Sequence, residues 1–359
     1  MNPNTIANAD LLSGLMSAKF NEPGSFVARD IFKPYGVKKR NGYIGVRTAK
    51  NMRANDITGA DGARSVYLHP NDIERMSYAL ALKKFHTDIR WEQLEGADDA
   101  IDPAEEFVDA ANMIAEQHAI ALEAAFVTKC AAANFGTGAS GNSSASWGAL
   151  SGLVPNASAK AFSDIDATLE AGRTLIGKRF DSLFFTAEAW SLFCRNAEVT
   201  GYIKTTLPGM PGIGQIETIK AVFGLRQIVI GGAVKNTAND GPAEGFTGTS
   251  LYAAAAANHF VLAFNGEPPS KRCKGFGYFL YLDRPVTPPS GGPNPGIKTV
   301  TGDDYLGSGA SIKTTFEHKQ DPESTIVYGA SRWALTFGAV DAASTGKAIG
   351  GYRLDIQLT

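Results

Sequence analysis

The chain contains 359 residues with a formal net charge of −2, and 44% of them are hydrophobic. This length suggests about two domain-sized units with a substantial core, and the near-neutral charge gives no case for a dedicated nucleic-acid-binding domain, which normally has a strongly basic face. No apolar run reaches the ~20 residues that span a bilayer, and the N-terminus lacks the charged-then-apolar pattern of a secretory signal. We therefore expect a soluble protein made in the cytosol, with no membrane partner.

The N-terminal residues 1–28 are polar and small, and Pro3, Pro23 and Gly24 interrupt any long helix. This composition predicts an extended arm, which can become ordered only against a neighbour.

A hairpin is predicted next. Two extended segments, Asp30–Val37 and Tyr43–Thr48, flank the sequence Lys38-Lys39-Arg40-Asn41-Gly42, and Asn-Gly between extended segments is a strong turn signal. Pro34 restricts its strand to the edge of a sheet. From the residues alone, a solvated surface hairpin is the preferred interpretation of this segment.

A long helix is predicted from Asp102 to about Cys130. Asp102-Pro103-Ala104-Glu105 places an acidic N-cap, a proline at the first helical position and a glutamate at the third, which is a clear helix start. One apolar stripe follows at helical spacing and comprises Phe107, Ala111, Ile114, Leu122 and Ala125. His118 lies on the same stripe, and we interpret it as a packed, hydrogen-bonded residue and not as a ligand.

A loop of small residues follows Phe135 and contains Gly136-x-Gly138-x-x-Gly141. A dinucleotide-binding fingerprint must follow a strand and open a helix, whereas this motif follows a helix and enters a serine-rich stretch. We therefore predict a flexible connection. Another helix begins at Ser163-Asp164 and ends at Gly177.

The region from Phe180 to Ala238 predicts a compact α/β unit. Ser182–Phe185 has strand character, and Thr186 follows as the N-cap of a helix that carries Trp190 and Phe193. A second amphipathic helix ends at Gly224, and Gln227–Ile230 is expected to form a buried strand before the Gly231-Gly232 pair.

The C-terminal part begins after a break rich in proline and glycine at residues 287–296. Alternation of Trp333, Leu335 and Phe337, and later of Tyr352, Leu354 and Ile356, with more polar residues predicts half-buried antiparallel strands.

The sequence offers no catalytic, cofactor or metal motif. Walker A, His-Glu-x-x-His, Cys-x-x-Cys and Gly-x-Ser-x-Gly sequences are absent, and the five histidines have no local metal spacing. Three cysteines, odd in number and far apart, indicate reduced structural thiols; they are Cys130, Cys194 and Cys273. Acidic pairs near the long helix, Asp98-Asp99 and Glu105-Glu106, are interpreted as dipole partners and solvated charge. The basic cluster Lys271-Arg272-Lys274 is interpreted as a solvated loop, with contact to DNA phosphates or an acidic neighbour as the alternative.

The α/β region resembles the major capsid proteins of tailed bacteriophages, in the branch that carries Phe-x-Thr-x-x-x-Trp-x-x-Phe-x-Arg. The matching positions are Phe184 or Phe185, Thr186, Trp190, Phe193, Arg195, Phe223, Gly224, Leu225, Ile230, Gly231 and 236–238. Asn196-Ala197 stands where that family often has His-Pro, so the turn is expected to form differently.

This resemblance implies an α+β fold of the Hong Kong 97 type. Its expected parts are an N-terminal arm (1–28), an extended-loop hairpin (29–75), a peripheral domain (76–132) with the spine helix at about 102–130, an axial domain (133–264) and a return to the peripheral domain with C-terminal β strands (265–359). In that fold the hairpin reaches an adjacent subunit, which reverses the interpretation of a merely solvated hairpin. Candidate subunit contacts are Lys38, Lys39 and Arg40 in the hairpin, and Leu207, Pro208, Met210 and Pro211 in a loop expected near the capsomer axis.

The resemblance further implies a structural protein, not an enzyme. Pentamers and hexamers would close into an icosahedral shell around double-stranded DNA, with a separate scaffolding protein, a portal and decoration proteins as further partners. Its location would be the virion, and the host cytoplasm during assembly. An encapsulin-type shell around a cargo enzyme and a soluble α/β enzyme with a site assembled from distant residues are the alternatives.

Overall fold

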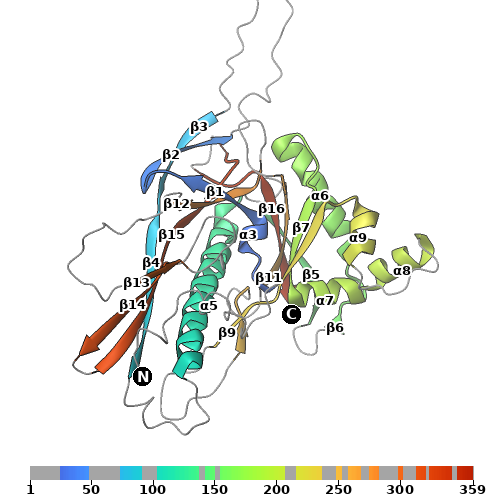
Figure 1. Cartoon of the computed structure of the whole chain (residues 1–359). Helices are drawn as coiled ribbons and strands as arrows, with labels where there is room; N and C mark the ends of the chain where they lie inside the picture. The colour runs from blue at the N-terminus through green and yellow to red at the C-terminus, as the bar shows by residue number, and fades with distance from the viewer. Residues whose placement is uncertain are drawn as a thin grey trace, which may run out of the picture.

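The computed structural model describes residues 25–47, 73–90, 103–136, 142–149, 154–206, 216–236, 248–252, 258–267, 275–282, 298–301, 313–320, 323–341 and 346–358. Within these residues the fold is α+β, as predicted, with two six-stranded sheets and two small two-stranded sheets. Figure 1 shows the long helix α5 (Pro103–Lys129) near the middle of the molecule, with the larger sheets on either side of it.

The long helix forms where the sequence predicts it. Its 27 residues correspond to about 40 Å at ~1.5 Å per residue. Ile114, Leu122 and Phe126 are buried along one stripe, because residues three and four apart share a face of a helix. Phe126 contacts Phe32 on one side and Phe184 on another, at ring-centroid distances of 6.0 and 5.3 Å. The helix therefore joins parts of the chain that are far apart in sequence.

The first six-stranded sheet covers one side of α5 (Figure 1). Its order is β1-β12-β15-β14-β13, and β4 also pairs with β15 outside this order. These strands are β1 (Phe32–Val37), β4 (Ala81–Arg90), β12 (Gly277–Leu282), β13 (Lys298–Thr301), β14 (Lys313–Gln320) and β15 (Glu323–Phe337). β15 is antiparallel to β4, β12 and β14. The alternating C-terminal pattern around Trp333 and Phe337, both buried, thus predicts this strand correctly.

The predicted pairing of the hairpin is wrong. β1 pairs in parallel with β12, while β2 (Asn41–Arg47) pairs antiparallel with β3 (Ile73–Ala79). Asn41 and Gly42 belong to β2, opposite Ala79 and Tyr78, and do not form its turn. The fully buried ring of Phe32 explains the difference, because it holds β1 in the core beside β12. β1 does lie at a sheet edge, as Pro34 predicts.

The second six-stranded sheet has the order β6-β5-β16-β11-β7-β8. Its strands are β5 (Asn142–Ala149), β6 (Val154–Pro155), β7 (Ser182–Thr186), β8 (Gln227–Gly231), β11 (Asn258–Phe264) and β16 (Gly351–Leu358). The helices around it are α6 (Ala161–Ile176), α7 (Ala187–Arg195), α8 (Ala197–Thr206) and α9 (Ile216–Phe223). The small remaining elements are α3 (Ala28–Ile31), η2 (Ala132–Asn134), β9 (Val234–Asn236) and β10 (Gly248–Ser250).

Three expectations for this sheet need correction. The serine-rich stretch after Gly141 is a strand, β5, because it pairs in parallel with β16 and buries Trp147. β8 is half-buried and not buried, since it forms the sheet edge. The last strand, β16, lies between β5 and β11 in the second sheet and does not return beside the long helix. The C-terminal strand that packs against that helix is β15.

Helix boundaries depend on side chains both near and far in sequence. Thr186 caps α7 as predicted, since its hydroxyl accepts a hydrogen bond from the Ala189 amide at 3.4 Å. Helix α6 starts at Ala161, two residues before the predicted Ser163. Glu198 accounts for this difference, because its carboxylate accepts hydrogen bonds from the Phe162 amide (2.9 Å) and the Ser163 hydroxyl (2.6 Å). A distant carboxylate thus supplies the cap that the local sequence lacks.

Asn196 forms the turn where the resembling family often has His-Pro. It ends α7, and its side-chain oxygen accepts a hydrogen bond from the Glu198 amide at 2.9 Å, at the start of α8. Its side-chain amide also donates to the Ala159 carbonyl at 3.1 Å. One buried asparagine therefore joins two helices without a proline.

Candidate assembly surfaces

The turn between β1 and β2 carries the predicted contacts Lys38, Lys39 and Arg40, all of them exposed. The turn is held through its backbone: the Arg40 carbonyl accepts from the Leu80 amide at 2.9 Å, and the Lys39 carbonyl accepts from the Tyr78 hydroxyl at 3.2 Å. These bonds use only backbone groups of the turn, and all three cationic side chains are exposed.

Arg332, on β15, adds a fourth cation to this turn. It pairs across the sheet with Leu82, two residues beyond Leu80. The pKa of Arg332 lies below its ordinary value, first through desolvation and then through the like charge of Arg40. We call Lys38, Lys39, Arg40 and Arg332 the basic corner.

Strands β2 and β3 lie side by side at the upper left of the molecule (Figure 1). Strand β2 alternates as a half-buried strand should: Ile44 and Val46 join the core, whereas Tyr43 is 73% exposed. One face of β2 is thus anchored in the core, and its other face is exposed to solvent.

The second set of predicted contacts, Leu207, Pro208, Met210 and Pro211, lies outside the described residues. The flanking helices α8 and α9 are described. Tyr202 on α8 stacks on Phe162 at a centroid distance of 4.2 Å and is 40% exposed. Ile216, the first residue of α9, is 37% exposed.

A buried carboxylate holds the start of the described chain. Glu123 of α5 is 1% exposed. It accepts hydrogen bonds from the Ala28 amide (2.7 Å) and the Tyr252 hydroxyl (3.0 Å). That hydroxyl also lies 2.8 Å from the Ser25 carbonyl. Burial raises the pKa of Glu123 to about 7, and these hydrogen bonds oppose the rise. The first described residues, Ser25 to Ala28, are therefore held against the long helix.

A buried guanidinium lies at the C-terminal end of α5. Arg353 of β16 is 4% exposed, donates to the Cys130 carbonyl and pairs with Asp355 at 2.6 Å. Its charge lies 4.2 Å from the centroid of the Phe260 ring. A cation at the C-terminal end of a helix interacts favourably with the helix dipole, so the last strand stabilises the end of the long helix.

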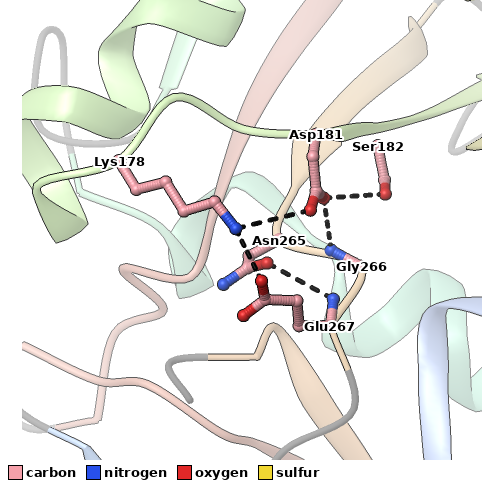
Figure 2. Close-up of polar contacts among 6 residues, drawn as sticks. All are labelled: Lys178, Asp181, Ser182, Asn265, Gly266 and Glu267. Atoms are coloured by element: carbon pink, nitrogen blue, oxygen red, sulfur yellow. Dashed lines mark hydrogen bonds and ion pairs between the residues drawn. The ribbon is translucent and has the colours of Figure 1, made fainter. Parts of the chain in front are cut away.

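A polar cluster joins the loop before β7 to the loop after β11 (Figure 2). Asp181 is its centre: one carboxylate oxygen accepts from the Gly266 amide (2.8 Å) and the Ser182 hydroxyl (2.9 Å). Lys178 bridges to Glu267 at 2.7 Å and lies 3.7 Å from Asp181. A Cβ on Gly266 would lie 2.2 Å from the Ser182 hydroxyl oxygen, so this approach requires glycine. The cluster is a structural connection between the two loops, since its polar groups form hydrogen bonds and ion pairs with one another.

The described residues offer little for catalysis or metal binding. They contain no group of three or more His, Cys, Asp or Glu side chains that could hold a metal ion. His118 is a packed residue, as predicted: it is fully buried, shares a hydrogen bond with Ser331 at 3.0 Å and lies edge-on to Phe85. Burial lowers its pKa.

The described cysteines are free thiols, in agreement with the sequence. Burial raises the pKa of Cys130, and it raises that of Cys194 to about 11. Neither is therefore a reactive thiolate. Cys273 and the cluster Lys271-Arg272-Lys274 lie outside the described part of the chain. Across the described helices, none combines the length and apolar character that crossing a bilayer requires.

The sequence patterns did not predict the structural roles of buried Glu123 and Arg353. Glu123 had a usable signal: it follows Ala119 by four residues and precedes Phe126 by three, so it occupies the buried stripe of the helix. Arg353 alternates with buried Tyr352 and Leu354, so the pattern predicts that it lies on the polar face of the strand. Its burial results from contacts with Cys130 and Phe260, which no local pattern encodes.

Comparison of the whole fold with solved structures gives one consistent result. A phage-related protein from Bordetella bronchiseptica RB50 matches with a TM-score of 0.61 and 14% identity, covering 96% of each chain. A subunit of the bacteriophage PhiM1 mature capsid matches with a TM-score of 0.54 and 10% identity, over 95% of this chain and 89% of the other. The chain has the fold of phage capsid proteins.

A capsid subunit of a native GTA particle extends this result, with a TM-score of 0.50 and 12% identity over 95% of this chain and 92% of the other. No protein-family model and no curated protein sequence matches the chain. The similarity therefore resides in the three-dimensional arrangement, which the long helix and the two larger sheets define.

Proposed function

We propose that this chain is the major capsid protein of a tailed bacteriophage, a structural protein without enzymatic activity. Pentamers and hexamers of the chain close into an icosahedral shell that encloses double-stranded DNA. The observation that carries the proposal is the agreement of 95% of this chain with a subunit of the PhiM1 mature capsid. A match over nearly the whole chain leaves little of this protein for a separate catalytic domain.

The physical basis of this function is repeated association. Each subunit contributes several modest contacts, and their sum becomes large when many copies join, because later contacts form within an already assembled particle. Closed symmetry then removes the open edges. The β2–β3 pair supports this role, because Ile44 and Val46 anchor one face of β2 in the core while Tyr43 is exposed on its other face.

The parts of the chain would divide this work. In our proposal, residues 1–28 form an arm, 29–75 the extended loop, 76–132 and most of 265–359 a peripheral domain, and 133–264 together with strand β16 an axial domain. The loop with Leu207, Pro208, Met210 and Pro211 lies near the capsomer axis. Other partners are a separate scaffolding protein, a portal, decoration proteins and DNA bound without sequence specificity. Assembly takes place in the host cytoplasm, and the mature location is the virion.

The decisive experiment is electron microscopy of particles from cells that express the chain alone and together with a scaffolding protein from the same genome. We expect closed shells whose density fits the described residues, with subunit contacts at the hairpin and at residues 207–211. A folded monomer that forms no shell in either case would contradict the proposal. Shells that contain a protein cargo and no DNA in infected cells would instead assign the encapsulin alternative, and turnover by a monomer would assign an enzyme.

A further inference from the structure

Strand β4 forms an edge of the first six-stranded sheet. It pairs with β15 along all ten of its residues, from Ala81 opposite Trp333 to Arg90 opposite Ser324, and with no other described strand. Successive residues of a strand direct their backbone N–H and C=O groups alternately to its two sides, so about half of these groups in β4 point away from β15. The part of the chain that the structure describes supplies no backbone hydrogen bond on that side.

The edge of β4 lacks several features that usually protect an open edge. Natural sheets often end in a short strand, a strand with a proline or a strand with a bulge. The β1 edge of the same sheet follows this rule, because β1 has six residues and contains Pro34. In contrast, β4 has ten residues, no proline and an unbroken register with β15. Its edge is therefore suited to pair with a further strand.

The side chains of β4 alternate between a packed face and an exposed face. On the packed face, the ring of Phe85 lies edge-on to that of His118, at a centroid distance of 4.8 Å. On the other face, Lys84, His86 and Asp88 are exposed. A strand added beside β4 would continue this alternation, so its own exposed face would meet these three residues.

The order of the charges makes the edge of β4 self-complementary. Lys84 and Asp88 lie two residues on either side of His86. When two copies of β4 pair antiparallel with His86 opposite its counterpart, Lys84 of each copy lies opposite Asp88 of the other. Directly opposed charges of unlike sign stabilise a sheet, and like charges there destabilise it. Other antiparallel registers that keep the same faces together lose both ion pairs, so the charges select one register.

We propose that the β4 edges of two subunits pair antiparallel about a two-fold axis at His86, so that their two sheets become one continuous sheet. This inference rests on the proposed shell function and names a contact within it. Rings of subunits are built by heterologous contacts, in which two different surfaces meet. A shell also needs contacts between rings. The β4 contact is isologous, because the same surface of both copies meets itself, and it would join a subunit of one ring to a subunit of the next.

The first test reads the register with cysteines. Directly opposed residues of an antiparallel pair have Cα atoms about 4.5–5.5 Å apart, which a disulfide can span. We expect His86→Cys chains to form a disulfide-linked dimer under a mild oxidant, with residue 86 joined to residue 86. The matched control is Lys84→Cys, because residues 84 of the two copies would lie about 13 Å apart and should not cross-link to each other. A mixture of Lys84→Cys and Asp88→Cys chains should cross-link.

Mass spectrometry of the linked peptides, on unassembled chains and on particles, separates this inference from the proposed function. Shells in which His86→Cys does not cross-link to itself would overturn the pairing and leave the function intact. Equal self-cross-linking of His86→Cys and Lys84→Cys would also overturn it. Cross-linked dimers that never form shells would support the pairing and contradict the function, and the absence of both dimers and shells would overturn both.

The second test exchanges the charges. We expect Lys84→Asp to lower the yield of closed shells by about tenfold or more, because both pairs then place two acidic residues opposite each other. Asp88→Lys should do the same, and the combined variant Lys84→Asp/Asp88→Lys should restore shells. The control Lys160→Asp changes an exposed lysine elsewhere by the same charge and should leave the yield unchanged. Circular dichroism checks that each variant folds, and failure of the folded combined variant to restore shells would overturn the pairing.

Discussion

Glu123 illustrates how one buried proton can satisfy several polar groups. The Tyr252 hydroxyl has a single proton, yet it lies within hydrogen-bonding distance of two acceptors, Glu123 and the Ser25 carbonyl. When Glu123 is protonated, it can donate to the Tyr252 oxygen while Tyr252 donates to Ser25, so every group is satisfied. Ionisation of Glu123 leaves a charge in a desolvated site, and this desolvation acts against the charged form more strongly than the hydrogen bonds from Ala28 and Tyr252 favour it.

Replacement of Glu123 by glutamine tests this account. The folded-state pKa of about 7 lies above the ordinary 4.5, so the folded chain binds more protons in that window, and its stability falls as pH rises from 4.5 to 7. Glu123→Gln keeps the shape and a donor but cannot ionise. We expect the variant to gain up to about 3 kcal/mol relative to the wild type between pH 4.5 and pH 8. Denaturant unfolding of both chains across this range is the measurement, and parallel pH profiles would contradict the expected protonation.

The buried ion pair of Arg353 and Asp355 leads to a second prediction. Arg353→Met keeps the volume of the side chain but leaves Asp355 without its cation and the Cys130 carbonyl without its donor. Breaking a buried pair costs about 3–5 kcal/mol, which chemical denaturation would measure. The double variant Arg353→Met/Asp355→Asn removes both charges and should lose less than the sum of the two single changes. Additive losses would show that the two side chains do not stabilise each other.

Among the elements, those encoded by local periodicity were predictable and those encoded by distant partners were not. The stripe of Ile114 and Leu122 identifies α5, and the Thr186 hydroxyl identifies the start of α7, because both signals lie within a few residues. The start of α6 depends on Glu198, more than 30 residues away. The contacts proposed for Lys38, Lys39 and Arg40 remain predictions, since they require a second copy of the chain.

The strand pairing of the hairpin shows the same limit. Asn41-Gly42 has the composition of a tight turn, and yet β2 pairs with β3, which lies 26 residues further along the chain than the end of β2. The choice between partners is made by burial, because Phe32 draws β1 into the core beside β12. The residue types of a turn do not indicate which distant strand a segment pairs with.

The alternation of β2 leads to a prediction for this element. Ile44 is 8% exposed and packs into the core, so Ile44→Ala should cost about 2–5 kcal/mol in chemical denaturation. Its neighbour Tyr43, 73% exposed, provides the matched control, and Tyr43→Ala should change stability by less than about 0.5 kcal/mol. Equal losses for the two variants would contradict the observed register, because a shift of one residue would exchange their environments.

At the scale of the whole molecule, the second sheet unites two hydrophobic cores. Phe260, Leu262 and Phe264 of β11 face the cluster around α5, whereas Val261 and Ala263 face the cluster around α6 and α7. Successive side chains of a strand point to opposite faces, so one strand contributes to both cores. Because damage to either face disturbs the same backbone, we expect the two cores to unfold together.

This coupling can be tested with tryptophan fluorescence. Trp147 belongs to the α6–α7 cluster, and Trp333 belongs to the α5 cluster. In a chain whose other three tryptophans are replaced by phenylalanine, Trp147 reports on its own cluster alone. Leu262→Ala removes a fully buried side chain from the opposite cluster and should destabilise the chain by about 2–5 kcal/mol. We expect the Trp147 transition in denaturant to move by this full amount and to coincide with the loss of circular dichroism, since a single cooperative transition gives the same midpoint with every probe. An unchanged Trp147 midpoint would mean that the two cores unfold independently, despite the strand that they share.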